Sequence, residues 1–375
     1  MTTETDTALV EQARAIAVLA GRQAEKAEAT RSPDPQVIEA IRVGGFARHF
    51  VPARYGGNEG SFAALKRAGV LVGSECPASA WCAVVAALMV RGAGCLPAEG
   101  RAQVWAGGPD TLIAGGIAPR GTAIPVDGGW SLSGTWPSVT AVEYSDWVLL
   151  AAQVPIDGDR HSRLFVVPRS AVTVAGTWDD IGMRATGSHT VVVDAVPVAA
   201  TMSFPWSSFA EMDAPQAGPD GRAVPLAAVN TLIFCLPMLG AARGALREWQ
   251  QLMRTKLTAS DREPDFAYYA EPFARSASEI DAAEMLLDRV AQVADTAVTV
   301  DRDAVARNQR DCAFAAGLLI DAVDRLMRIS GSAGHSAGGA FQRFWRDIHT
   351  AGGHAALQFG RAATPFARAQ LTGAN

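Results

Sequence analysis

Two histidines near the C-terminal end of the chain are the side chains best suited to proton transfer at neutral pH. His349 and His354 lie in a region whose composition favours helices. Their five-residue offset corresponds to about 140° around a helix, so the two rings do not point at one metal ion, and no HExxH spacing accompanies them. No metal site is predicted. An imidazole with a pKa near 6.5 can donate or accept a proton, and for His354 this role competes with an ordinary structural one.

Small hydroxyl side chains gather at two turns in the middle of the chain. They are Ser138, Val139 and Thr140 after the segment GTW, and Thr186, Gly187 and Ser188 before the segment HTVVVDAV. Serine and threonine in such turns usually bond the neighbouring backbone. The functional alternative is that these hydroxyls and the adjacent backbone N–H groups hold a ligand from a rigid strand.

The elements that must position these residues fall into three regions. Residues 1–108 favour helices: Asp34 and Pro35 suit a helix start, and an Ala/Val-rich segment at 78–90 suits a second helix. Residues 109–222 contain short β-branched runs between glycine turns, which favours a small β-barrel or sandwich. Residues 223–375 favour a helical bundle, with helices expected at 226–257, 266–300, 304–330 and 339–370. The predicted fold class is therefore α+β and multidomain.

Composition narrows the possible environments. The 375 residues carry a net charge of −5, so no general attraction to nucleic acid or to an anionic membrane is expected. Five cysteines without a CxxC pair do not suggest a disulfide framework. The longest apolar run, 223–239, is interrupted by Pro225, Asn230 and Pro237, and the first residues do not resemble a signal peptide. These features predict a cytoplasmic protein that does not span a membrane.

Four segments in this order resemble the acyl-CoA dehydrogenase superfamily over nearly the whole chain. They are FVPARYGG, GGWSLSGTWPSVTAVEYSDWVLLA, DDIGMRATGSHTVVVDAVPV and FQRFWRDIHTAGGH. The forms TGSHTVVVDAVPV and RDIHTAGGH are similar to the two-component flavin-dependent monooxygenases, such as the 4-hydroxyphenylacetate hydroxylase oxygenase component, the dibenzothiophene monooxygenase and the nitrososynthases. The resemblance implies a helical domain, a β domain and a C-terminal four-helix bundle. It also implies an oxygenase that uses O2 and reduced flavin from a separate reductase, by way of a C4a-hydroperoxyflavin, on a small organic substrate.

The resemblance also assigns roles to residues near the flavin. Thr140 matches the hydroxyl residue that bonds flavin N5, where serine is usual, and the two turns containing Ser138, Val139, Thr186, Gly187 and Ser188 match the flavin edge. Arg346, Asp347 and His354 match an RD(x6)H pattern in which the histidine faces the flavin C4a side and the substrate. Trp81 and Met89 match substrate-pocket positions. Met89 stands where the phenol and thiophene oxygenases commonly have a second histidine, and ordinary core packing is an equal alternative for both residues.

The sequence leaves alternatives open for the identity of the cofactor and for the reaction. Arg254 and Lys256 could hold the flavin phosphate, although both could simply face solvent. The chain lacks the arginine-x-x-phenylalanine-glycine element of FAD-dependent dehydrogenases, which favours reduced FMN over FAD. Ala355 stands where many acyl-CoA dehydrogenases have a catalytic glutamate, but Glu248 lies in a region where others place it. A dehydrogenase acting on an acyl thioester and a non-catalytic flavin-binding protein are therefore the alternatives. The resemblance implies a homotetramer.

Overall fold

The computed structural model describes residues 4–156, 159–210, 224–258, 266–297 and 299–372. Its N-terminal part is helical, and two of its helices begin at side chains that cap them. The first helices are α1 (Glu4–Thr30), α2 (Pro35–Val43), α3 (Phe62–Gly73), α4 (Pro77–Ala93) and α5 (Ala98–Val104). The Asp34 side chain accepts the Gln36 N–H and caps α2, and Ser61 caps α3 through the Ala64 N–H. Helix α4 is buried on nearly all sides, which makes it the centre of this region.

The middle of the chain forms one sheet of seven described strands. They are β1 (Ile113–Val126), β2 (Gly129–Val139), β3 (Trp147–Ile156), β4 (Asp159–Pro168), β5 (Thr173–Ala175), β6 (His189–Ala199) and β7 (Ser203–Pro205). Their order is β5-β6-β2-β1-β3-β4-β7, and every pair is antiparallel except β1 and β3. Leu132 and Trp136 of β2 are buried, as the period-two pattern of this segment predicts.

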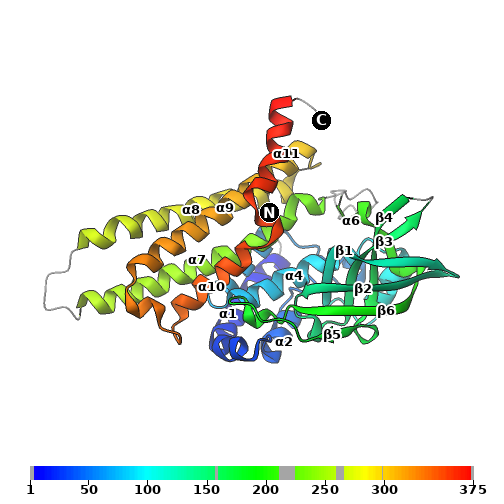
Figure 1. Ribbon diagram of the computed structural model, residues 1–375, viewed down its shortest axis with the longest axis horizontal. Coiled ribbons are helices and arrows are strands. Elements are labelled where there is room, and N and C mark those ends of the chain that lie inside the picture. The colour runs from blue at the N-terminus through cyan, green and yellow to red at the C-terminus, as the bar shows by residue number, and fades with distance from the viewer. Residues whose placement is uncertain (1–3, 157–158, 211–223, 259–265, 298, 373–375) are drawn as a thin grey trace.

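The C-terminal part is a bundle of long helices preceded by the short helix α6 (Trp206–Ala210). The bundle contains α7 (Leu226–Thr258), α8 (Phe266–Thr296), α9 (Arg302–Ile329), α10 (Ala340–Gly352) and α11 (Phe359–Thr372). The helix expected at 339–370 is thus two helices, because Gly352 and Gly353 end α10 before His354. In Figure 1, the bundle and the sheet lie at opposite ends of the molecule, with α4 and the other N-terminal helices between them and α11 projecting outward.

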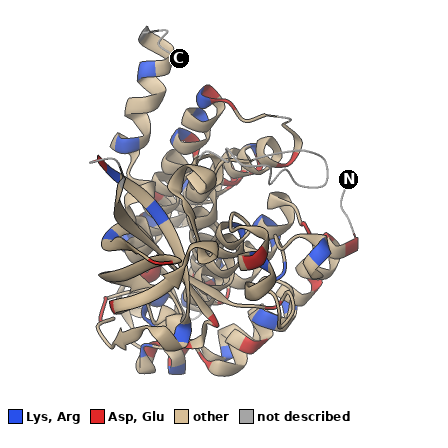
Figure 2. Cartoon of the chain, turned by 90° about the vertical axis from the view of Figure 1, so that its right-hand side faces the viewer, with Lys and Arg blue, Asp and Glu red and all other residues tan. Residues whose placement is uncertain are grey.

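The predicted order of helices, sheet and helical bundle is confirmed. The predicted boundary at 222/223 lies outside the described residues, and the division into 1–108, 109–222 and 223–375 stays a prediction. One described helix, α7, is long and apolar enough to cross a membrane by composition, but 83% of its most apolar window is buried inside the protein. Burial of that kind is what a core helix of the bundle requires. Figure 2 shows acidic and basic residues interspersed along the ribbon in that view.

Candidate functional site: a hydroxyl chain facing an aromatic cluster

The two hydroxyl-bearing turns meet in space and form one hydrogen-bonded chain. The Trp81 indole N–H donates to Thr140 Oγ1 over 3.2 Å, and Thr140 Oγ1 lies 3.1 Å from Ser188 Oγ. Ser188 Oγ lies 2.8 Å from Thr186 Oγ1, which donates to the Met183 carbonyl over 2.9 Å. Thr140, Thr186 and Ser188 are all buried. The chain therefore links helix α4, the end of β2 and the turn before β6.

Local backbone geometry turns these hydroxyls toward one another. The β2–β6 register shifts between Trp136 and Val139, and Ser138 has a positive φ of 59°. This bulge leaves Ser138 exposed and buries Val139, which pairs with His189. Gly187 also has a positive φ, of 53°, and a Cβ there would lie 3.0 Å from Pro33 Cδ. Glycine is therefore required at the second turn for both its conformation and its close packing.

Asp347 of α10 holds the second turn in place through a hydrogen bond. Its Oδ1 accepts the Met183 N–H over 2.5 Å, and the carboxyl group is almost fully buried. Burial, helped by the nearby Glu28, raises the Asp347 pKa to about 7 against the opposing effects of the Met183 N–H, Arg346 and Arg343. The neighbouring Arg346 donates to the Ile181 carbonyl over 2.6 Å. The RD pair thus holds both ends of the short segment that precedes the hydroxyl turn.

His354 lies beside this chain in an aromatic cluster. Its ring centroid is 4.0 Å from that of Phe234 and 5.9 Å from that of Trp81, and the Phe234 and Trp81 rings stack at 4.9 Å. Burial lowers the His354 pKa to about 4, so the ring is neutral at pH 7. The residue is not on a helix face: it follows α10 and caps the short turn at Ala355–Leu357.

The cap determines which nitrogen of His354 carries the proton. Nδ1 accepts the Ala356 N–H over 3.2 Å, so it must be unprotonated. A neutral imidazole with an acceptor at Nδ1 has its hydrogen on Nε2. His354 can therefore donate a hydrogen bond from Nε2, whereas its only lone pair is already used by the backbone. This geometry favours the donor role over the proton-acceptor role that the sequence left open.

His349 has a separate and structural environment. Its Nε2 lies 2.8 Å from Asp324 Oδ1, an oxygen that also accepts the Trp345 indole N–H over 2.6 Å. This contact ties α10 to α9. The two histidines therefore do not converge, although the reason is that α10 ends between them and not only their helical offset.

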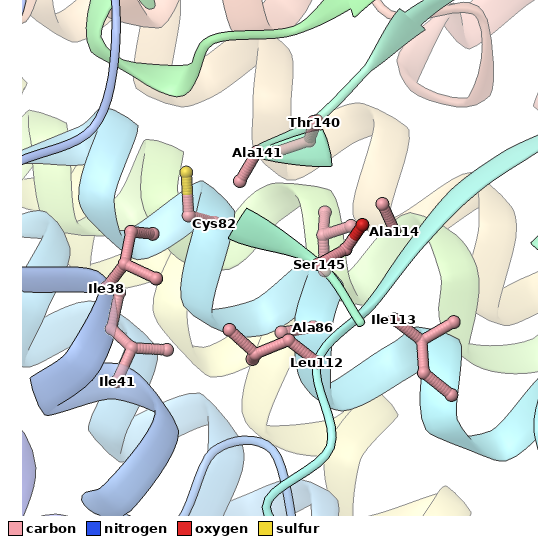
Figure 3. Close-up of a pocket in the computed structure, with 11 residues that line it drawn as sticks. Ile38, Ile41, Cys82, Ala86, Leu112, Ile113, Ala114, Thr140, Ala141 and Ser145 are labelled. Atoms are coloured by element: carbon pink, nitrogen blue, oxygen red, sulfur yellow. The ribbon is translucent and has the colours of Figure 1, made fainter. Parts of the chain in front are cut away.

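Two cavities lie near residues that the sequence singled out. The first, of about 20 Å³, is lined by α2, α4 and the strand ends at Thr140 and Ala141 (Figure 3). In that view, Ile38, Cys82 and Ala86 face it from the helices. The cavity is mostly apolar and is large enough for about one water molecule.

The second cavity, of about 580 Å³, lies between the end of α7 and the loop that follows α9. Lys256, Gly331 and Glu248 line it together with neighbouring residues, while Arg254 is not among its lining residues. The Lys256 ammonium also lies 5.3 Å from the centre of the Tyr269 ring. Of the two predicted phosphate-binding residues, Lys256 is thus the one that faces a cavity. Glu248, the alternative base, belongs to this cavity and not to the cluster around His354.

Met89 lies on α4, eight residues after Trp81. It packs against β1, where a Cβ at Gly115 would lie 2.1 Å from the Met89 sulfur. Met89 is buried, as is usual for a core residue. Phe234, by contrast, was not singled out from the sequence, because nothing in the apolar pattern of α7 distinguishes it from the other core residues of that helix.

Comparison with known proteins agrees with this geometry. Residues 232–359 match the family described as acyl-CoA dehydrogenase, C-terminal domain. The chain is 27% identical over 354 residues to the flavin-dependent monooxygenase oxygenase subunit HsaA of Rhodococcus jostii, covering 91% of this chain and 92% of that protein. It is also 27% identical over 395 residues to the FADH(2)-dependent resorcinol hydroxylase oxygenase component of a Rhizobium species, covering 97% and 94%.

Solved structures give the same result for the fold. The 3-HSA hydroxylase of Rhodococcus sp. RHA1 superposes with a TM-score of 0.92 at 24% identity, covering 97% of each chain. XiaF of a Streptomyces species, in complex with FADH2 and glycerol, has a TM-score of 0.90 at 25% identity, covering 99% of this chain and 96% of that one. FMN-bound TdsC of a Paenibacillus species has a TM-score of 0.83 at 19% identity, covering 97% of each. The chain therefore has the fold of these structures, its residues 232–359 match the acyl-CoA dehydrogenase C-terminal domain, and the relatives named above are oxygenase components of flavin-dependent monooxygenases.

Proposed function

We propose that this protein is the oxygenase component of a two-component flavin-dependent monooxygenase that acts on a small aromatic substrate. The observation that carries the proposal is His354, held neutral with an Nε2–H donor beside the stacked rings of Trp81 and Phe234 and next to Thr140. The similar relatives support it, since they are named as monooxygenases and hydroxylases of aromatic compounds, such as resorcinol hydroxylase and indole-3-acetate monooxygenase.

The residues present fit a flavin. Thr140 Oγ1 accepts one hydrogen bond from Trp81 and has a second lone pair available. Backbone groups of Ser138, Val139 and Ser188 would bind the polar atoms along one side of the flat ring. Either FMN or FAD suits this edge, and the similar proteins include an FADH2 complex and an FMN complex.

Reduced flavin, when bound, supplies the electrons that split dioxygen, so that one oxygen atom enters the substrate and the other leaves as water. The chain's own residues bind and orient. Thr140 would accept a hydrogen bond at the flavin N5 edge, and His354 would donate from Nε2 toward the reacting oxygen. Trp81 and Phe234 pack against the His354 ring and keep water from its neutral face. Exclusion of water favours oxygen transfer over release of hydrogen peroxide.

The flavin phosphate and the partners belong to the same proposal. Lys256 lies 22 residues after Phe234 on α7, about 33 Å along the helix, so it would hold the phosphate of a flavin bound by another copy of the chain, with Arg254 adding a more distant positive charge. A separate reductase would deliver reduced flavin, and a homotetramer in the cytoplasm would place the bundle against other copies of the chain. The three segments 1–108, 109–222 and 223–375 would act as its domains.

The acyl-thioester dehydrogenase is the less favoured reading. That reaction requires a carboxylate to remove the α-proton of the substrate. Among the described residues, no carboxylate has a hydrogen bond or ion pair with His354 or Thr140. Ala355 occupies the position of the usual glutamate, and Glu248 lines the other cavity.

One experiment separates these functions. The purified protein is supplied with FMN, a flavin reductase, NADH and O2, and aromatic compounds such as indole and resorcinol are tested as substrates. A product that carries one atom from labelled O2, and that requires the reductase, supports the proposal. Reduction of bound flavin by a substrate in the absence of the reductase would instead identify a dehydrogenase.

A further inference from the structure

The cavity of about 20 Å³ beside Thr140 has a mostly aliphatic wall. Of its 11 lining residues, eight are alanine, valine, leucine or isoleucine, and the other three are Cys82, Thr140 and Ser145. Figure 3 shows these side chains around one space between α2, α4 and the start of β1. All of the lining residues except Ala141 are buried. The cavity therefore lies inside the protein and not in a surface groove.

The three polar side chains in this wall already have partners within the protein. Ser145 Oγ donates to the Val142 carbonyl over 2.9 Å. Cys82 Sγ lies 3.9 Å from the Thr186 carbonyl, at the distance of a weak sulfur hydrogen bond. The Thr140 hydroxyl belongs to the hydroxyl chain described above. The polar side chains of the wall are therefore already hydrogen-bonded before any guest enters the cavity.

The backbone along the strand side of the cavity is paired as well. The Leu112 N–H donates to Asp146 Oδ2 over 2.8 Å, and the Leu112 carbonyl accepts the Asp146 N–H over 2.8 Å. Residues 113–114 pair with β3, and the Ala141 N–H donates to the Thr186 carbonyl over 3.0 Å. A buried water needs about two to four polar partners, whereas apolar cavities stay dry and take apolar guests. The wall therefore favours a small apolar guest over water.

Thr140 connects this cavity to the site around His354. Its hydroxyl accepts the Trp81 N–H, and its side chain also lines the cavity. His354 and Phe234 are not among the described lining residues, so the cavity is separate from the aromatic cluster. In the proposed function Thr140 meets flavin N5, and the flavin carbon that reacts with dioxygen is bonded directly to N5.

We propose that this cavity is a binding site for dioxygen. The inference rests on the proposed function, which makes dioxygen a substrate. Dioxygen is apolar and dissolves better in hydrocarbon than in water, so a dry aliphatic cavity raises its local concentration. The cavity has room for a molecule of about this size but not for an aromatic ring. Dioxygen bound there lies one side chain away from the flavin edge and does not compete with a substrate beside His354.

Xenon is the first probe, because this apolar atom enters dry cavities. Wild-type crystals under xenon pressure should show an anomalous peak in the cavity, with or without flavin. Ala86→Val adds methyl groups to the cavity from α4, and Ala114→Val adds them from β1. Each substitution should remove the peak. Absence of xenon from the wild-type cavity would overturn the inference.

The second measurement is the second-order rate constant with which dioxygen oxidises reduced FMN bound to the protein. Ala86→Val and Ala114→Val should each lower it by about threefold or more, the equivalent of one small apolar contact. The dissociation constant of reduced FMN should not change. Ala40→Val is the matched control, since Ala40 is half-buried on α2 and does not line the cavity. It should change neither the xenon peak nor the rate.

The outcomes separate the inference from the proposed function. Unchanged rates in folded Ala86→Val and Ala114→Val overturn the inference and leave the flavin site standing. Equal slowing in Ala40→Val, or weaker FMN binding in both cavity variants, also overturns it. If the wild-type protein does not bind reduced FMN, the proposed function fails and the inference fails with it. Overpacking can destabilise a core, so melting temperatures are compared, and either folded cavity variant suffices because the two fill the cavity from different elements.

Discussion

Two histidines, one at the end of helix α10 and one in the loop that follows it, have opposite environments. His349 lies on the helix, one-third exposed, and its ring bonds the Asp324 carboxylate. His354 lies five residues later in the loop, among aromatic rings, and within the described part of the chain its ring bonds only the Ala356 backbone N–H. The first ring is held by a carboxylate, whereas burial of the second lowers the His354 pKa to about 4.

This difference indicates that His354, and not His349, is available to bind a ligand. A carboxylate partner fixes the ring of His349 and joins two helices, so the ring has no free role. A backbone N–H on Nδ1 fixes the tautomer of His354 and leaves Nε2–H free to meet a ligand. Retained neutrality and a fixed donor are the properties expected of a group that must remain a hydrogen-bond donor across the physiological pH range.

The largest effect is expected for His354. His354→Ala should lower coupled product formation by about 10²–10⁴, with hydrogen peroxide released in place of product. His354→Gln retains an N–H donor and should recover part of the loss, because the proposed role is donation. The measurement is product and peroxide yield per NADH oxidised, with flavin binding as the control. Full coupled turnover in a folded His354→Ala variant would rule out this role.

The pH dependence of coupling tests the same role of His354. Because the His354 pKa is lowered to about 4 by burial, the ring stays neutral above that pH. Coupling should therefore show no ionisation near the usual histidine pKa of about 6.5. An inflection near 6.5 that disappears in His354→Gln would contradict the neutral-donor account.

The next largest effect, on the free energy of unfolding, is expected for Asp347. Its pKa is raised to about 7, mainly by burial, so between about pH 4 and pH 7 the folded protein holds a proton that the unfolded chain has lost. The contribution of this group to stability is full below about pH 4 and is lost as the pH rises through about 7. At about 1.4 kcal/mol per pKa unit, the loss is a few kcal/mol. Asp347→Asn keeps an acceptor for Met183 and should remove this loss.

The check is urea unfolding at about pH 5 and about pH 8. Asp347→Asn should be more stable than wild type at the higher pH, and the difference should shrink at the lower one. Asp311→Asn is a matched control, since Asp311 is equally buried but ion-paired with Arg289 and Arg310. The assignment fails if the two variants share one pH dependence.

A smaller effect is expected at the cavity beside α7. Lys256→Ala should weaken FMN binding by roughly three- to tenfold, because an exposed ammonium contributes about 1 kcal/mol to a phosphate contact. Arg254→Ala also removes one positive charge, but from a residue that does not line the cavity, so it should have a weaker effect. Titrations at low and high salt measure both. Equal losses for the two variants would point to general attraction and not to a phosphate site.

The smallest effect on activity is expected for His349. Removing its contact with Asp324 should cost about 1 kcal/mol of stability and change coupling by no more than a few-fold. Thermal melts and peroxide yields of His349→Ala, measured beside His354→Ala, give the comparison. A greater loss of coupling in His349→Ala would reverse the roles assigned to the two histidines.

Much of the fold and part of the site could be predicted from the sequence. Periodicity and turn residues predict the order of helices, strands and bundle, and Gly352–Gly353 is the sequence signal for the end of α10 inside the expected helix 339–370. Thr140, Thr186 and Ser188 could be predicted as two separate groups. That the two groups meet at one site could not be predicted. Their meeting depends on the β2–β6 register shift and on a hydrogen bond between Met183 and Asp347, which are 164 positions apart.

The most direct test of the central claim is rapid mixing of the protein and reduced FMN with oxygenated buffer. The account predicts a transient absorbing species, distinct from both reduced and oxidised FMN, that decays slowly in the wild-type protein and faster in His354→Ala. One-phase formation of oxidised FMN, at the rate seen without the protein, would contradict the proposed monooxygenase.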